Sequence, residues 1–137
     1  MKCLDTTLLI DIVEHPEETR RVVERFEQEH ETLATTTFNA YEALLGVHSL
    51  RDGDQRTKLL DLYSRVLSRL VVLPLSLEDA AQAAEIGGDL RRRGQDVGAD
   101  VLTAAIALRS GCDGVVTRNV DHFRRIAKIR ELAVVPY

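Results

Sequence analysis

The sequence predicts an α/β fold in which helices cover both faces of a mostly parallel sheet of five strands. Short apolar runs alternate with longer segments of helical periodicity from one end of the chain to the other. The first apolar run begins at the N-terminus, as is common for a central strand in a sheet of this kind. Consecutive parallel strands are expected to be joined by right-handed crossovers.

The five predicted strands are short apolar runs. The first, residues 1–4, leads directly into the carboxylate of Asp5. The others are residues 33–36, 71–75, 114–117 and 133–135.

Helix signals fill the segments between these strands. Pro16 and two glutamates open an amphipathic helix that extends to about residue 30. Thr36 or Thr37 can cap a helix over 39–46 or beyond, and a turn at 51–54 precedes a helix with apolar residues as far as Leu70.

The second half of the chain follows the same pattern. Ser76 can cap a helix from residue 77 to about 93, which Gly94 ends. Residues 101–108 are apolar almost all round, which predicts a buried helix. Asn119 can cap a short helix that extends through residue 126.

Composition indicates one globular domain over residues 1–137, with 45% hydrophobic and 29% charged residues. No window offers the roughly 18 uninterrupted apolar residues of a membrane span, and no signal peptide precedes the first strand. We therefore expect a cytoplasmic protein without membrane contact. The net charge of −4 gives no general attraction to nucleic acid, so local basic clusters or metal ions would have to hold a polyanion.

Several kinds of site are disfavoured. Cys3 and Cys112 lie in apolar surroundings without paired spacing, which favours small core residues over a disulfide or zinc site. No serine or cysteine has a base beside it in sequence, so a covalent intermediate is not favoured. The histidines show no metal-ligand spacing; they are His15, His30, His48 and His122.

Acidic side chains follow the predicted strands. Asp5 ends the first strand, Glu42 lies in the helix after the second, Asp100 opens the buried helix, and Asn119 and Asp121 follow the fourth strand. Ligands of open α/β sheets bind beyond the carboxyl ends of the strands, so these side chains are expected to meet. Clustered carboxylates require a cation, and oxygen ligands suit Mg²⁺ or Mn²⁺, which can support phosphodiester hydrolysis.

Each of these residues also fits a structural role. Asp5, Asp100 and Asn119 are good helix caps, and Asp121 suits the positive end of a helix dipole. Glu42 is compatible with an ordinary surface glutamate.

Four segments carry a family resemblance, and they span nearly the whole chain. They are LDTTLLID at 4–11, TFNAYEALLG at 37–46, GADVLTAAIA at 98–107 and VTRNVDHF at 116–123. In this order they resemble the PIN-domain ribonucleases of the VapC toxin type. The resemblance implies a three-layer α/β/α fold and a Mg²⁺- or Mn²⁺-dependent endoribonuclease. It also implies pairing with a VapB-type antitoxin in a type II toxin–antitoxin module.

The same resemblance assigns roles to individual residues. Asp5, Glu42 and Asp100 match the three central acidic positions, with Asp5 and Asp100 anchoring the metal and Glu42 completing its shell or orienting water. Asn119 stands where many relatives carry aspartate, and Asp121 is shifted by one from a later aspartate. Either of these two can hold a water or a second metal.

Substrate contacts are predicted around the same edge of the sheet. Thr6 and Thr117 offer hydroxyls, although both also suit turns, and Arg118 is placed to touch phosphate. Other cations are predicted either to form a basic rim or to be solvated; they are Arg91, Arg92, Arg93, Arg124, Arg125 and Lys128. Aromatic residues make up only 4% of the chain, so base stacking is not expected to dominate RNA recognition.

Apolar faces over residues 59–75 and 77–90 suggest a homodimer or a groove for an antitoxin helix, with internal packing as the alternative. Two other functions are considered. A receiver-like signalling domain needs an aspartate after the third strand, where this chain has Leu-Pro-Leu-Ser at 73–76. A degenerate PIN module would bind RNA or protein without cutting it, and the irregular fourth acidic position motivates this alternative.

Overall fold

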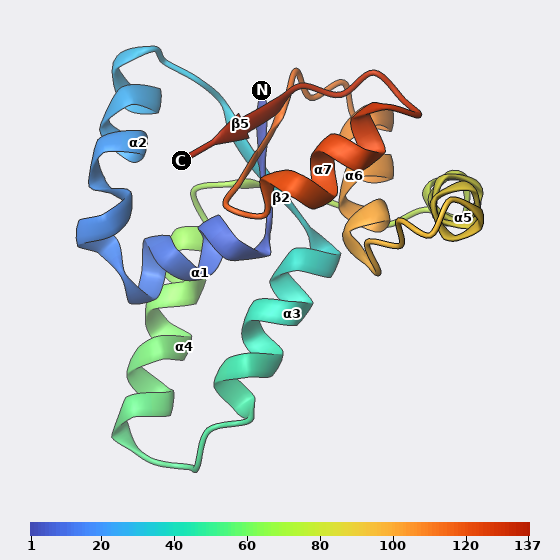
Figure 1. Cartoon of the computed structure of the whole chain (residues 1–137). Helices are drawn as coiled ribbons and strands as arrows, with labels where there is room; N and C mark the ends of the chain where they lie inside the picture. The colour runs from blue at the N-terminus through green and yellow to red at the C-terminus, as the bar shows by residue number, and fades with distance from the viewer.

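The computed structural model describes residues 1–137 and consists of five strands and seven helices (Figure 1). The strands are β1 (Lys2–Leu4), β2 (Leu33–Thr36), β3 (Val71–Leu73), β4 (Val115–Thr117) and β5 (Val134–Pro136). The helices are α1 (Thr6–Glu14), α2 (Pro16–Gln28), α3 (Thr37–His48), α4 (Asp54–Leu67), α5 (Leu77–Arg92), α6 (Asp100–Arg109) and α7 (Val120–Ala127).

All strand pairs in the sheet are parallel, and the strand order is β3-β2-β1-β4-β5. The N-terminal strand is therefore central, as predicted. Cys3 lies opposite Ala34 of β2 on one side and Val115 of β4 on the other. Because every strand points the same way, the residues that follow β1, β2 and β4 emerge at one edge of the sheet.

Helices cover both faces of the sheet, which confirms the three-layer α/β/α architecture (Figure 1). Successive strand residues point to opposite faces. Cys3 packs into the largest apolar cluster, which is built with α5, α6 and α7. Leu4 points the other way and packs with Leu8 of α1 and Phe26 of α2.

Helix α4 packs along α1 and α3, and most of its apolar side is covered within the chain. Tyr63 is fully buried, and its hydroxyl donates to the Glu14 carboxylate at 2.6 Å. Internal packing therefore accounts for most of the predicted apolar face over residues 59–70. Val71 and Val72 of the edge strand β3 are exposed instead.

Helix α6 is buried as its composition predicts, with Ala104 to Ala107 fully inaccessible to solvent. None of the helices has both the length and the apolar character needed to cross a membrane.

Several boundaries differ by one or two residues from the prediction, and two of these differences have an identifiable physical cause. The strand predicted over 71–75 ends at Leu73, because Pro74 has no N–H to donate to a neighbouring strand. The helix after β2 begins at Thr37, since the Thr36 hydroxyl accepts from the Asn39 N–H at 2.9 Å and is the cap.

Candidate active site

Asp5 is buried at the junction of β1 and α1, with only 3% of its surface exposed. Its Oδ1 accepts from the Leu8 N–H at 3.1 Å and from the Thr7 hydroxyl at 2.7 Å. Its Oδ2 accepts from the Thr117 hydroxyl at 2.5 Å. The side chain is therefore the N-cap of α1, and it also faces the site.

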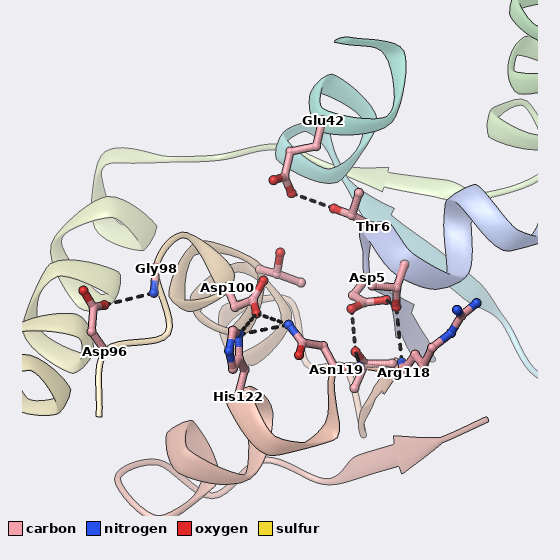
Figure 2. A network of polar contacts seen from close by, with 12 residues as sticks. Asp5, Thr6, Glu42, Asp96, Gly98, Asp100, Arg118, Asn119 and His122 are labelled. Carbon is pink, nitrogen blue, oxygen red and sulfur yellow. Dashed lines mark hydrogen bonds and ion pairs between the residues drawn. The ribbon is translucent and has the colours of Figure 1, made fainter. Parts of the chain in front are cut away.

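The backbone after β4 orients the two hydroxyls that contact Asp5 (Figure 2). The Arg118 N–H donates to Thr7 Oγ1 at 3.2 Å, and the Asn119 N–H donates to Thr117 Oγ1 at 2.8 Å. Each hydroxyl then donates its proton to a different oxygen of Asp5. Thr117 is fully buried, so it positions the carboxylate and is not open to substrate.

These contacts leave Asp5 one free acceptor position. Each carboxylate oxygen can accept two hydrogen bonds, so Oδ1 is saturated while Oδ2 has one lone pair left. Burial raises the pKa of Asp5, opposed by hydrogen bonds from Thr117, Thr7 and Leu8, and the nearby charge of Asp100 raises it further. A cation bound at Oδ2 would offset both the burial and the repulsion.

Glu42 reaches the site from the second turn of α3, where its Oε1 accepts from the Thr6 hydroxyl at 2.6 Å (Figure 2). One turn earlier lies Asn39, which is fully buried. Its amide donates to the Leu4 carbonyl at 2.9 Å, and its oxygen accepts from the Thr103 hydroxyl of α6 at 2.7 Å. Asn39 thus ties together the elements that carry Glu42, Asp5 and Asp100, a role that the sequence analysis missed.

Asp100 is the first residue of α6, and Ala99 occupies the cap position, so the carboxylate does not serve as the N-cap. Asp100 Oδ2 lies 2.7 Å from Nδ1 of His122 and 3.0 Å from Nδ2 of Asn119 (Figure 2). Asn119 precedes α7 but makes no capping hydrogen bond, because its amide is directed to Asp100.

The loop before α6 is held in place by a local contact. Asp96 Oδ1 accepts from the Gly98 N–H at 2.9 Å (Figure 2). Gly98 has a φ of +61°, a left-handed conformation that favours glycine. This turn brings the start of α6, and with it Asp100, to the sheet edge.

Two side chains predicted to belong to the site make no contact with Asp5, Glu42 or Asp100. Asp121 is exposed, and its side chain takes part in none of the hydrogen bonds or ion pairs of the chain. The guanidinium of Arg118 pairs with the buried carboxylate of Asp11, and it lies over the Tyr137 ring at 5.8 Å from the ring centroid. The residue that sequence reasoning missed here is His122, whose only signal was its position next to Asp121 in the fourth motif.

The carboxylates of Asp5, Glu42 and Asp100 come from three different elements and face a common region (Figure 2). No three His, Cys, Asp or Glu side chains are close enough to form a ready-made metal cluster. The donor set still suits a hard divalent ion, because unoccupied lone pairs remain on Asp5 Oδ2 and on one oxygen each of Glu42 and Asp100. Such an ion would be held by Asp5 and Asp100, directly or through water.

Comparison with known proteins identifies the family of this chain. Residues 2–129 match the profile of the PIN domain family. The chain is 33% identical to Ribonuclease VapC1 of Rickettsia felis over 94 residues, which is 68% of this chain and 69% of that protein.

Solved structures show the same fold over nearly the whole chain. One is DNA-bound VapBC from Salmonella typhimurium, with a TM-score of 0.78, 27% identity and coverage of 98% of this chain and 96% of that one. Another is VapBC2 from Rickettsia felis bound to a promoter DNA fragment, with a TM-score of 0.80, 24% identity and coverage of 99% and 98%. The chain therefore belongs to the PIN domain family and is related to the VapC ribonucleases.

Proposed function

We propose that this protein is a Mg²⁺- or Mn²⁺-dependent endoribonuclease and the toxin of a type II toxin–antitoxin module. The observation that carries the proposal is the buried carboxylate of Asp5, which faces Asp100 across the sheet edge and has one acceptor position left for a cation. The ribonuclease activity named for the Rickettsia felis relative supports the choice of RNA as the substrate.

The residues of this chain divide the work of such a reaction. Asp5 and Asp100 would hold the ion, while Thr7 and Thr117 keep the Asp5 carboxylate fixed. Glu42, oriented by Thr6, has a free oxygen that can accept a proton from the attacking water. A bound ion would offset charge on the phosphate and lower the pKa of that water.

The cations best placed to contact the RNA backbone lie on α7 and at its C-terminal cap. Arg91, Arg92 and Arg93 are paired with Asp96 or Asp89, whereas Arg124 and Lys128 are exposed and have no acidic partner. The logarithm of the RNA-binding constant falls linearly with the logarithm of the salt concentration. We expect Arg124→Gln and Lys128→Gln each to make this slope shallower by about one unit. An unchanged slope in both variants would show that neither side chain contacts the RNA backbone.

A homodimer and a VapB-type antitoxin are the proposed protein partners. Four apolar side chains on and beyond the edge strand are 39–87% exposed; they are Val71, Val72, Leu75 and Leu77. Sedimentation velocity would test the dimer, which Val72→Lys and Leu77→Lys together should dissociate. A wild-type monomer at micromolar concentration would argue against self-association through this face.

Cleavage of a structured RNA pool by the purified protein tests the catalytic proposal. With Mg²⁺ or Mn²⁺ the wild type should cut the RNA, and EDTA should abolish cutting. Asp100→Asn and Glu42→Gln should each lower the rate by about 100-fold or more. Asp61→Asn is a matched control, because Asp61 is exposed and pairs only with Arg65.

Either of two results would contradict catalysis by this site. One is cutting that persists in EDTA, and the other is equal cutting by wild type and folded Asp100→Asn. If the wild type binds RNA but cuts it with neither ion, the non-catalytic PIN module becomes the better description.

A further inference from the structure

We propose that Asp11, Arg118 and Tyr137 form an anchor that positions the carboxylates of Asp5 and Asp100. None of the three side chains contacts either carboxylate, so they are positioning residues that act through the loop between β4 and α7. The inference rests on the proposed metal-dependent function, and it gives a role to Asp11, a buried carboxylate of α1 that the proposed reaction does not use.

The anchor is built around the carboxylate of Asp11, which is 5% exposed. The guanidinium of Arg118 forms an ion pair with Asp11 Oδ2, and the hydroxyl of Tyr137 donates to the same oxygen at 2.6 Å. The guanidinium also lies over the Tyr137 ring, 5.8 Å from the ring centroid. Burial raises the pKa of Tyr137, which keeps its hydroxyl a proton donor. Each of the three side chains therefore contacts the other two.

Arg118 is attached to α1 at two points that lie one turn apart. Its backbone N–H donates to Thr7 Oγ1 at 3.2 Å, while its guanidinium points away from Asp5 and pairs with Asp11 (Figure 2). Residues four apart in a helix share one face, so Thr7 and Asp11 present their side chains to the same loop residue. Thr7 in turn donates to Asp5 Oδ1 at 2.7 Å. The two contacts fix the position of residue 118 along α1.

The neighbours of Arg118 in the chain contact the two carboxylates that would hold the ion. Thr117 donates to Asp5 Oδ2 at 2.5 Å, and the Asn119 amide donates to Asp100 Oδ2 at 3.0 Å. Holding residue 118 in place therefore also holds the donors on both carboxylates. A metal site needs this support, because its ligands must stay within about 0.5 Å of the binding geometry.

Stability alone does not explain a charged anchor at this place. Replacing a buried ion pair by apolar side chains of similar volume is often neutral or stabilising, because the charges no longer have to leave water. Asp11→Leu together with Arg118→Met should therefore fold, although the loop loses its fixed attachment to α1. An experiment can thus separate a positioning role from a stabilising one.

Calorimetric titration with Mn²⁺, combined with amide hydrogen exchange on the same samples, tests the anchor. Arg118→Met, alone or together with Asp11→Leu, should weaken Mn²⁺ binding by about tenfold, as the loss of groups that support metal ligands does. The N–H groups of residues 118 and 119 should exchange faster, because the loop is no longer held against α1. Arg118→Lys keeps a cation for Asp11 and should restore most of the affinity.

Tyr137→Phe and Tyr63→Phe are a matched pair of variants. Each removes one tyrosine hydroxyl that donates to a carboxylate at 2.6 Å. Tyr63 contacts Glu14, which lies at the opposite end of α1 from Asp5. Both variants should therefore unfold at a similarly reduced temperature, but only Tyr137→Phe should weaken Mn²⁺ binding, by at least about twofold.

Wild-type Mn²⁺ affinity in Arg118→Met, or in the double variant if the single one does not fold, would overturn the inference. Metal-dependent RNA cutting by the wild type would then still support the proposed function. Equal loss of affinity in Tyr137→Phe and Tyr63→Phe would also overturn it, since the effect would then follow from lost stability. If the wild type binds no Mn²⁺, the inference and the proposed metal dependence both fail.

Discussion

At the scale of single residues, neighbouring threonines support different carboxylates. Thr6 donates to Glu42, whereas Thr7 donates to Asp5, although both stand in the same first turn of α1. The sequence predicted that Thr6 and Thr117 offer hydroxyls to the pocket or substrate. Their contacts identify them as groups that position the acidic side chains. This role depends on tertiary packing, which a turn-forming sequence pattern does not reveal.

Replacing Thr117 by valine tests this positioning role. The change keeps the side-chain shape but removes the hydrogen bond that lowers the pKa of Asp5, so this pKa should rise. Metal binding should then reach its midpoint at a higher pH, and unfolding free energy should fall by about 1–3 kcal/mol. Thr117→Ser keeps the hydroxyl and should behave as wild type in calorimetric metal titrations at several pH values. Identical pH profiles for the valine and serine variants would contradict the role.

At the fourth acidic position, the sequence did not predict which side chain contacts Asp100. Residues Asp121 and His122 are neighbours, but consecutive helical side chains point about 100° apart. Which of them reaches Asp100 therefore depends on where α7 begins, and the observed start at Val120 directs His122 toward Asp100. Helix boundaries are uncertain by one or two residues from sequence alone, which is enough to exchange these two side chains.

At the scale of elements, a partly buried ion pair joins α6 to the start of α5. The guanidinium of Arg109 donates to both oxygens of the fully buried Asp79 at 2.5 and 2.9 Å, and to the Pro74 carbonyl at 3.1 Å. Asp79 also completes a capping box with Ser76. This pair keeps α6, which begins with Asp100, against the helix layer on its face of the sheet.

Arg109→Met should destabilise the protein by more than the loss of an exposed ion pair does, because it leaves Asp79 buried without its partner. Arg109 lowers the pKa of Asp79, so the pair contributes stability above the unfolded aspartate pKa of about 3.9, and this is lost as the pH falls below it. Urea unfolding at pH 7 and pH 3 should therefore show a smaller difference between wild type and variant at the lower pH.

The exposed pair of Arg65 and Asp61 provides the control for this experiment. Arg65→Met should change the free energy of unfolding by less than about 1 kcal/mol. If the two arginine variants were equally stable at pH 7, the pair of Arg109 and Asp79 would not stabilise the packing of α5 against α6.

The elements themselves were largely predictable. The strand at 33–36 and the buried helix near 101–108 have strong apolar patterns, and both lie within one residue of the predicted bounds. Interactions across the fold, such as those of Asn39 with the Leu4 carbonyl and Thr103, were not predictable, because their partners are 35 and 64 residues away.

At the scale of the whole molecule, the parallel sheet buries the carboxylate of Asp5, and burial disfavours its charged form. Burial raises the pKa of Asp5, so the folded state favours the protonated form. The stability that this provides is present below the unfolded pKa and is lost as the pH rises through the folded value. Ionised Asp5 is therefore destabilising unless a bound cation offsets its charge.

Asp5→Asn tests the central claim most directly, with thermal unfolding and RNA cleavage measured on the same samples with and without Mn²⁺. Without metal, the variant should unfold at the same temperature as wild type or a higher one, since it removes a buried charge. Mn²⁺ should raise the unfolding temperature of the wild type alone, and only the wild type should cut RNA. Cutting by Asp5→Asn at the wild-type rate, or an equal metal-induced stabilisation of both proteins, would contradict the account.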